Sequence, residues 1–182
     1  MIDSGASVAT WDVMPPQENR LGAPPAKYCV VDVTDEHSIA LATEEVISEL
    51  GDFEILVNCA GIGGPHIGVT DCALETWQRV LDVNLTGTFL CARAAVRHMS
   101  KRGTGRIVNV ASAAGKDGNP FSAPYACSRA AVIAFTKSLA KEVATTAIRV
   151  NCVTPGAVDT ELFRRLDASR RAAAIAKIRW GA

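Results

Sequence analysis

The chain has 182 residues, of which 48% are hydrophobic, and its 19 basic and 19 acidic side chains give a formal net charge of zero. This length and apolar content are typical of one domain with one sizeable core. A chain without net charge lacks the basic field that attracts nucleic acid or an anionic membrane surface. We therefore expect a single domain over residues 1–182 that binds neither nucleic acid nor membrane.

The cysteines, the histidines and the N-terminus bear on metal sites and cell compartment. The six cysteines contain no C-x-x-C pair, and several lie in apolar runs such as "YCVVDV" and "ILVNCAG", so we interpret them as small buried hydrophobic residues in a reducing compartment. The three histidines are far apart in the sequence, so we predict no metal site. The sequence shows no basic leader and no apolar run near the ~20 residues that span a bilayer. We expect a cytoplasmic protein.

Five short runs rich in β-branched residues predict strands, and the stretches between them have helical periodicity. The predicted strands are 7–13, 28–34, 54–61, 106–115 and 148–158. The predicted helices are 36–50, about 72–102, 125–146 and the tail 161–182. The strand runs are nearly continuous, which is typical of strands covered on both faces. Strands that alternate with helices predict an α/β fold with a parallel, doubly wound sheet.

Turn and capping residues mark where the predicted elements begin and end. The first long helix has a start at Asp35 and a stop at Gly51, and the second runs from near Asp71 to Gly103. The prolines in "MPPQENRLGAPPAK" (14–27) predict a surface loop in place of a crossover helix between the first two strands.

Polar and small residues stand at the carboxyl ends of the predicted strands, where ligands bind in sheets of this kind. Asp12 closes the first strand and Asp32 closes the second. The other strand ends are "NCAG" (58–61), "ASAAG" (111–115) and "PGAVDT" (155–160). We expect a ligand site along this edge of the sheet.

Five motifs, taken in order, resemble those of the short-chain dehydrogenase/reductase family over almost the whole chain. They are "NCAG", "LDVNLTGTF" with Asn84, "NVASAAG" with Ser112, "YACSR" with Tyr125 and Arg129, and "VTPGAVDT". The resemblance implies a Rossmann-like fold and an NAD(P)-dependent enzyme. Such an enzyme interconverts a secondary alcohol and a ketone by hydride transfer.

The resemblance also implies a role for each catalytic residue. Tyr125 exchanges the hydroxyl proton as general acid or base, Ser112 holds the substrate oxygen, and Asn84 anchors a water. A free phenol titrates near pH ~10, so Tyr125 needs a nearby cation to act near neutrality. Arg129 stands four residues later on the same helix face, where the family has lysine. Arginine keeps the positive charge, but it is planar, bulkier and does not release its proton.

The cofactor contacts that the resemblance implies lie at the strand ends and on the helix of the tyrosine. They are Asp12, Asp32, Val33, Asn58, Ala60, Gly61, Tyr125, Arg129, Pro155, Gly156, Val158 and Thr160. A carboxylate at Asp12 can hold both hydroxyls of the adenosine ribose and repel a 2′-phosphate, which favours NAD over NADP. Alanine and glycine after Asn58 allow a ligand to approach the backbone closely.

Two parts of the family pattern are not found in these residues. The glycine-rich turn that seats a pyrophosphate would, with the first strand, precede Met1, and the last strand would follow residue 182. In the family strand order 3-2-1-4-5-6-7, loss of strand 1 leaves strands 7–13 and 54–60 without their shared neighbour. We therefore expect a partial Rossmann-like domain that is truncated at both ends.

Two interpretations of function are open at this point. One is an NAD-dependent alcohol or ketone oxidoreductase, and the other is a non-catalytic fragment that keeps only the family's subunit surfaces. Helices 72–102 and 125–146 resemble those that pair across subunits, so we expect a homo-oligomer, either a dimer or a tetramer, in both cases. The stretch 118–142 and the ending "AKIRWGA" resemble members that act on sugar acids or 3-oxoacyl thioesters.

Overall fold

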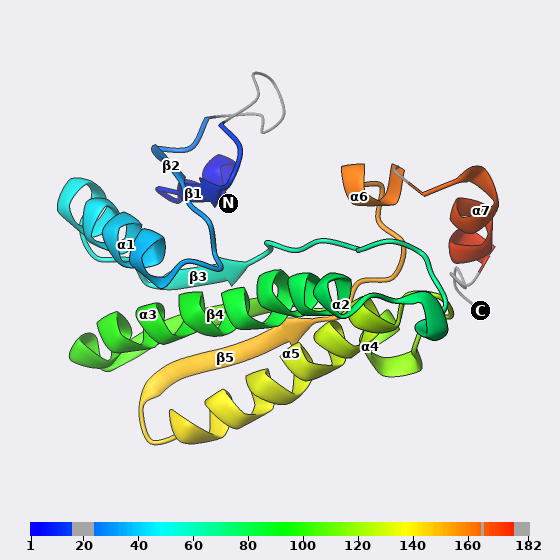
Figure 1. Cartoon of the computed structure of the whole chain (residues 1–182). Helices are drawn as coiled ribbons and strands as arrows, with labels where there is room; N and C mark the ends of the chain where they lie inside the picture. Colours follow the sequence, from blue (N-terminus) through cyan, green and yellow to red (C-terminus); the bar gives the residue numbers. More distant parts are fainter. Residues whose placement is uncertain (16–23, 165, 177–182) are drawn as a thin grey trace, which may run out of the picture.

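The computed structural model describes residues 1–15, 24–164 and 166–176. Its strands form two parallel sheets (Figure 1). The first sheet pairs β1 (Ala9–Asp12) with β2 (Lys27–Val30), and the second has the order β3 (Ile55–Asn58), β4 (Thr104–Val110) and β5 (Ala147–Val153). Parallel strands flanked by helices form the Rossmann-like arrangement that the sequence predicts.

The two sheets are not hydrogen-bonded to each other within the described parts of the chain. Ala9 of β1 lies opposite Lys27 of β2, and Asn58 of β3 lies opposite Asn109 of β4. No described strand pairs with the second edge of β1 or of β3. This confirms the prediction that these two strands lack a shared neighbour.

Helices connect the strands and follow them in sequence. Their bounds are α1 Glu36–Leu50, α2 Leu74–Leu81, α3 Gly87–Arg102, α4 Ala114–Asp117, α5 Ala123–Glu142, α6 Glu161–Arg164 and α7 Ala168–Ala176. Two short 3-10 helices, η1 (Ile2–Ser4) and η2 (Val69–Asp71), precede β1 and α2. A π-helical segment, η3 (Asp82–Thr86), joins α2 directly to α3. The predicted helix 72–102 is therefore continuous in direction but changes its hydrogen-bond pattern near the middle.

The predicted helix signals explain the ends of α1 and α3. The Asp35 side chain accepts a hydrogen bond of 2.9 Å from the His37 amide, which satisfies one of the free amides of the first turn of α1. Gly51 follows α1 with a φ of 82°, and Gly103 follows α3 in the left-handed helical conformation with a φ of 74°. A positive φ favours glycine at both positions.

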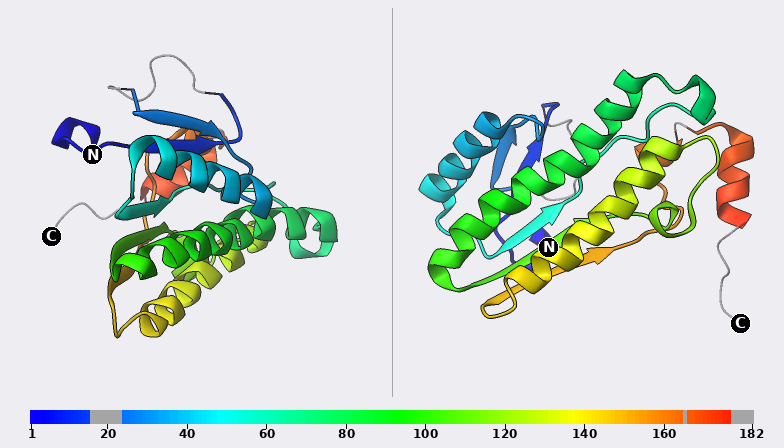
Figure 2. Two further views of the ribbon diagram at one scale, coloured as in Figure 1. Left: turned by 90° about the vertical axis from the view of Figure 1, so that its left-hand side faces the viewer. Right: turned by 60° about the horizontal axis from the view of Figure 1, so that its bottom comes forward.

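The three long helices α1, α3 and α5 pack on one face of the strands, as the right-hand view of Figure 2 shows. One buried cluster joins α3 and α5 to β4 and β5, and it includes Met99, Ile107 and Ile148. A second cluster joins α1 and α3 to the first sheet, and it includes Val31 and Ile39. Full burial of an aliphatic side chain of this size contributes about 1.5–3 kcal/mol.

The opposite face of the strands is open within the described residues. Outward side chains on three strands are well exposed: Val30 64%, Ile55 48%, Val57 39% and Val153 47%. The prediction that these nearly continuous apolar strands are covered on both faces is therefore wrong for the described structure. Burial along β4 and β5 alternates with a period of two instead.

Two further predictions need correction. Only Cys29 and Cys91 of the six cysteines are buried, whereas Cys59 and Cys127 are exposed, and all six are free thiols. Burial raises the pKa of the Cys91 thiol to about 12. The predicted tail helix is divided into α6 and α7, and its last residues, 177–182, lie outside the described residues. The central part of the predicted loop 14–27 also lies outside them.

Candidate active site

Asn84 lies in the π-helical segment and is fully buried. Its Oδ1 accepts a hydrogen bond of 2.8 Å from the Ile62 amide, and its Nδ2 donates to the Ile62 carbonyl at 3.0 Å and to Ser128 Oγ at 3.0 Å. Both amide hydrogens are thus used on protein groups, as a buried amide requires. Asn84 ties the turn after Gly61 to α5, and π-helical turns are frequent at functional sites.

Tyr125 lies in the first turn of α5 and is half-buried. The Ser128 hydroxyl donates a hydrogen bond of 2.7 Å to the Tyr125 carbonyl, so Asn84, Ser128 and the backbone of Tyr125 form one chain of contacts. Pro124 precedes the tyrosine in the first turn of the helix, where proline loses no intrahelical hydrogen bond. The tyrosine is therefore held on a rigid part of the fold.

Ser112 lies just after β4 and beside α5. Its Oγ accepts a hydrogen bond of 3.2 Å from the Ala114 amide at the start of α4. Gly115 lets α4 approach α5 closely, because a Cβ at Gly115 would lie 2.7 Å from the backbone of Arg129 and of Ala130. The serine hydroxyl thus has a local capping role, and its hydrogen remains available as a donor.

Arg129 lies one turn after Tyr125 and is buried, with 4% of its surface exposed. Its Nη1 donates a hydrogen bond of 2.9 Å to the Val110 carbonyl at the end of β4. The guanidinium carbon lies 5.2 Å from the centroid of the Tyr125 ring, within the range of a cation–π interaction. The structure therefore brings this cation next to the phenol, as the four-residue spacing predicts.

A chain of buried amides supports the loop that contains the N-C-A-G motif. Asn58 Nδ2 donates to Asn109 Oδ1 at 2.9 Å, and Asn109 Nδ2 donates to Thr136 Oγ1 at 2.9 Å. The sequence prediction includes Asn58 but misses Asn109 and Thr136. The available signal was an asparagine inside the apolar run "RIVNVAS", since a buried amide in a central strand requires a partner.

The P-G-A-V-D-T segment begins next to the serine. The Ala113 amide donates to the Pro155 carbonyl at 2.9 Å, which places the start of the segment beside Ser112. Thr160 Oγ1 accepts a hydrogen bond of 3.3 Å from the Phe163 amide at the start of α6. Gly156 and Val158 lie between them and are exposed.

Two carboxylates stand at the carboxyl ends of the first sheet: Asp12 is the last residue of β1, and Asp32 follows β2. Asp12 is exposed, and its Oδ1 accepts a hydrogen bond of 3.1 Å from the Met14 amide. Asp32 Oδ1 accepts hydrogen bonds from the Thr34 amide at 2.9 Å and from the Thr34 hydroxyl at 2.7 Å, and these bonds lower the pKa of Asp32. Val33 packs against the start of α3, since a Cβ at Gly87 would lie 2.7 Å from its side chain.

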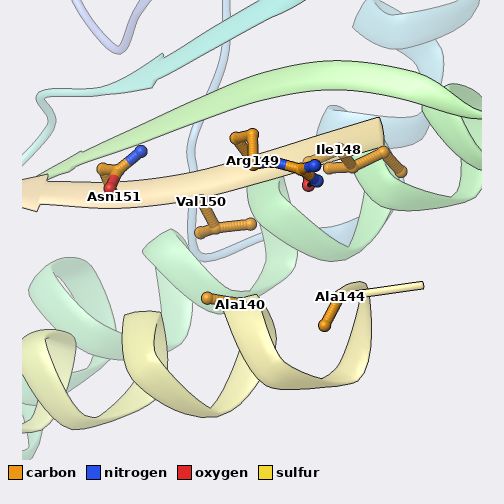
Figure 3. Close-up of a pocket in the computed structure, with 6 residues that line it drawn as sticks. All are labelled: Ala140, Ala144, Ile148, Arg149, Val150 and Asn151. Carbon is orange, nitrogen blue, oxygen red and sulfur yellow. Dashed lines mark hydrogen bonds between the residues drawn. The ribbon is translucent and has the colours of Figure 1, made fainter. Parts of the chain in front are cut away.

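Two hollows differ in their distance from this site. A hollow of about 290 Å³ lies between the C-terminal part of α5 and the outer edge of β5 (Figure 3). Ala140 of α5 and Ala144, which follows the end of α5, stand at least 15 residues after Tyr125, or roughly 22 Å along a helix, so we exclude this hollow from the site. A second hollow of about 270 Å³ lies beside the start of α5, and its lining is Ile67, Val69, Cys72, Leu74, Trp77, Ala123 and Pro124.

Comparison with known proteins decides the family. A sequence profile of the family described as short chain dehydrogenase matches residues 5–171. The chain belongs to this family. Within the described residues, no helix is long and apolar enough to cross a membrane. The same residues contain no group of three or more histidine, cysteine or acidic side chains that could hold a metal ion.

Individual relatives of the chain include dehydrogenases and reductases. The 2-dehydro-3-deoxy-L-rhamnonate dehydrogenase (NAD(+)) of Sphingomonas sp. (strain SKA58) is 38% identical over 93% of this chain and 69% of its own length. The 3-oxoacyl-[acyl-carrier-protein] reductase FabG of Escherichia coli (strain K12) is 38% identical over 84% of this chain and 62% of its own length. The chain thus spans about two thirds of the curated relatives that it matches.

A solved structure confirms the Rossmann-like fold of the chain. The structure of ElxO with NADP bound superposes with a TM-score of 0.73 at 33% identity and covers 79% of this chain and 58% of that chain. The relatives therefore include one whose name specifies NAD(+) and one solved with NADP. Both relatives are thus linked to a nicotinamide dinucleotide, but they differ in whether that dinucleotide is NAD or NADP.

Proposed function

We propose that this protein is an NAD-dependent oxidoreductase that interconverts a secondary alcohol and a ketone by hydride transfer, with Tyr125 as the general acid or base. The observation that carries the proposal is the assembly around Tyr125. Its ring lies 5.2 Å from the buried Arg129 cation, and its backbone is tied through Ser128 to Asn84. A phenol beside a fixed cation at a family active site is suited to proton exchange with a substrate oxygen.

The residues that would hold the dinucleotide fit such a group. Ala60 after β3 is exposed and Gly61 is half-buried, and the exposed carboxylate of Asp12 stands at the end of β1. When bound, the dinucleotide supplies the hydride acceptor or donor. Ser112 would hold the substrate oxygen, since its hydroxyl hydrogen remains free. The remaining predicted contacts, Asp32, Val33, Asn58 and the 155–160 segment, lie along the same strand ends.

NAD is the preferred dinucleotide in this proposal because of Asp12. A carboxylate at this position can accept hydrogen bonds from both ribose hydroxyls, and it repels a 2′-phosphate. We expect Asp12→Ser to weaken NAD binding and to narrow the preference for NAD over NADP by about tenfold or more, equivalent to about 1.4 kcal/mol. Fluorescence titration of both dinucleotides measures this ratio, and tighter binding of NADP by the parent protein would contradict the assignment.

The substrate is a small molecule, and the hollow beside the start of α5 is the candidate place for it. Its apolar lining and its position next to Pro124 place it close to Tyr125 along the chain. The Sphingomonas and Escherichia coli relatives support sugar acids and 3-oxoacyl thioesters as the first two substrate classes to test. A cytoplasmic location stays a prediction.

Homo-oligomerisation through the outer face of α3 and α5 is part of the proposal. Phe89 is 39% exposed, lies under the Arg93 guanidinium at 5.0 Å and meets the Phe135 ring edge-on at 6.0 Å. An exposed aromatic group on two adjacent helices is typical of a subunit contact. A dimer or a tetramer formed through this face fits either function of the chain.

A second candidate function follows from the split between the two sheets. A chain with unpaired edges at β1 and β3 could act only as an associating fragment, without catalysis. To separate the two, we define the chimera as the 182-residue chain flanked by the unmatched ends of the Sphingomonas relative. Turnover of secondary alcohols by the chimera with NAD supports the enzyme. A folded, dinucleotide-binding chimera that shows no turnover with any substrate class would support the fragment.

A further inference from the structure

The Arg129 side chain is packed between two backbone segments. It is buried to 96%, and its Nη1 is held by the Val110 carbonyl at 2.9 Å. Its Nε is also buried and has no hydrogen-bond partner, and none of the ion pairs within the described residues involves it. A buried, incompletely bonded guanidinium is costly for stability, so we looked for a role of Arg129 in its other contacts.

The other end of this guanidinium lies against Gly61. A Cβ at Gly61 would be 2.0 Å from Arg129 Nη2, 3.0 Å from Arg129 Cζ and 3.0 Å from Asn84 Oδ1. Unlike five other glycines among the described residues, Gly61 does not have a positive φ, so its backbone conformation does not require glycine. The shortest contact that a side chain at position 61 would make is with the arginine, and Asn84 Oδ1 adds a second, weaker restriction.

Arginine and lysine differ at this contact. The guanidinium is planar and carries two terminal nitrogens, one on the Val110 carbonyl and one against Gly61. Lysine has a single compact ammonium group on a flexible stem, which can bond the carbonyl without filling the space at Gly61. Glycine at position 61 and arginine at position 129 therefore form a matched pair in this chain.

We propose that Arg129 is a positioning residue that clamps the 59–62 turn to the end of β4, and that Gly61 is required because of this clamp. The turn carries predicted dinucleotide contacts, so the clamp sets where the dinucleotide meets Tyr125. This part of the inference rests on the proposed function. The coupling between Gly61 and Arg129 is independent of the proposed function.

Thermal unfolding of four proteins tests the coupling in the 182-residue chain: the parent, Gly61→Ala, Arg129→Lys and the double variant. We expect Gly61→Ala to lower the Tm of the parent by about 5 °C or more, and to lower the Tm of the Arg129→Lys protein by less than half as much. Gly68→Ala is the control, since a Cβ there would meet nothing closer than 3.5 Å. If Gly61→Ala alone does not fold, recovery of a folded protein in the double variant is the expected result. The proposal is wrong if the Tm changes of the two single variants add in the double variant, or if Gly61→Ala does not fold and the double variant does not fold either.

Two further measurements separate a clamp from a general contribution to stability. In Arg129→Lys, amide hydrogen exchange should rise about tenfold in residues 59–64 and stay unchanged in α1, where a general loss of stability would raise both. In the chimera, the same variant should raise the KM for NAD with little change in kcat, because the positive charge beside Tyr125 is retained. An equal rise in amide exchange in residues 59–64 and in α1 would contradict the clamp. A loss in kcat without a rise in the KM for NAD would contradict it as well. A chimera without turnover would refute the proposed function and leave the unfolding result intact.

Discussion

At the scale of single residues, buried polar groups connect the strands to the catalytic helix. Asn109 is fully buried, accepts from Asn58 and donates to Thr136, so it joins β3, β4 and α5. Each of these bonds would be unfavourable to lose, because its partner would remain buried without water. The same logic applies to Asn84, which joins the 59–62 turn to Ser128.

Replacement of Asn109 tests this amide chain. Asn109→Ala leaves the buried Asn58 amide without its partner and removes the hydrogen bond to Thr136 Oγ1, which keeps only its bond to the Val132 carbonyl. We expect the free energy of unfolding to fall by about 2–3 kcal/mol. Asn151→Ala is the matched control, since Asn151 is exposed on the neighbouring strand β5 and should change stability by less than about 0.5 kcal/mol. Urea unfolding measures both. Equal losses in the two variants would show that the amide chain adds nothing.

At the scale of elements, glycine at the start of α3 sets how closely the helix approaches the segment after β2. In an ordinary exposed helix, replacement of a glycine by alanine stabilises the helix by about 1 kcal/mol. Here the new Cβ would lie 2.7 Å from the Val33 side chain and 3.2 Å from the Val33 carbonyl oxygen, and overpacking costs about 1–3 kcal/mol. We expect a net lower stability, measured by thermal unfolding. A higher Tm would show that Val33 moves away without cost.

Elements and motifs were predicted well where local chemistry decides the structure. The start of α1 at Asp35 and its stop at Gly51 depend on capping and on a positive φ, which are local properties. The π-helical segment at Asn84 was not predicted, because it depends on contacts with Ile62 and Ser128, which are distant in sequence. Exposure of Val30 and Val57 was missed for the same reason, since apolar content does not specify what covers a strand.

The candidate site followed from its motifs, and its supporting residues did not. The four-residue spacing correctly placed Arg129 next to Tyr125. The contact between Arg129 and Gly61 joins α5 to the turn after β3, and no pattern of spacing within either segment indicates it. The predicted contacts with the dinucleotide stay predictions.

At the scale of the whole molecule, the described strands divide into two separate sheets. The second edges of β1 and β3 have no strand partner among the described residues, and the outward side chains of Ile55 and Val57 are exposed nearby. Unpaired apolar edges promote association between chains.

We therefore expect the 182-residue chain to unfold at low temperature and to associate as its concentration rises. The chimera should unfold at a higher temperature that depends less on concentration. Light scattering and calorimetry over a range of concentrations compare the two proteins. A sharp, reversible and concentration-independent transition of the 182-residue chain would count against this view of the molecule.

The central claim is that Tyr125 exchanges the substrate proton in an NAD-linked hydride transfer. Its most direct test is the steady-state rate of NADH formation by the chimera and by its Tyr125→Phe variant. Tyr28→Phe serves as the control, because it removes the only other tyrosine hydroxyl of the chain. We predict a loss in kcat of about 10²- to 10⁴-fold for Tyr125→Phe and an unchanged kcat for the control. A Tyr125→Phe protein that is folded, binds NAD and turns over at the parent rate would contradict the account.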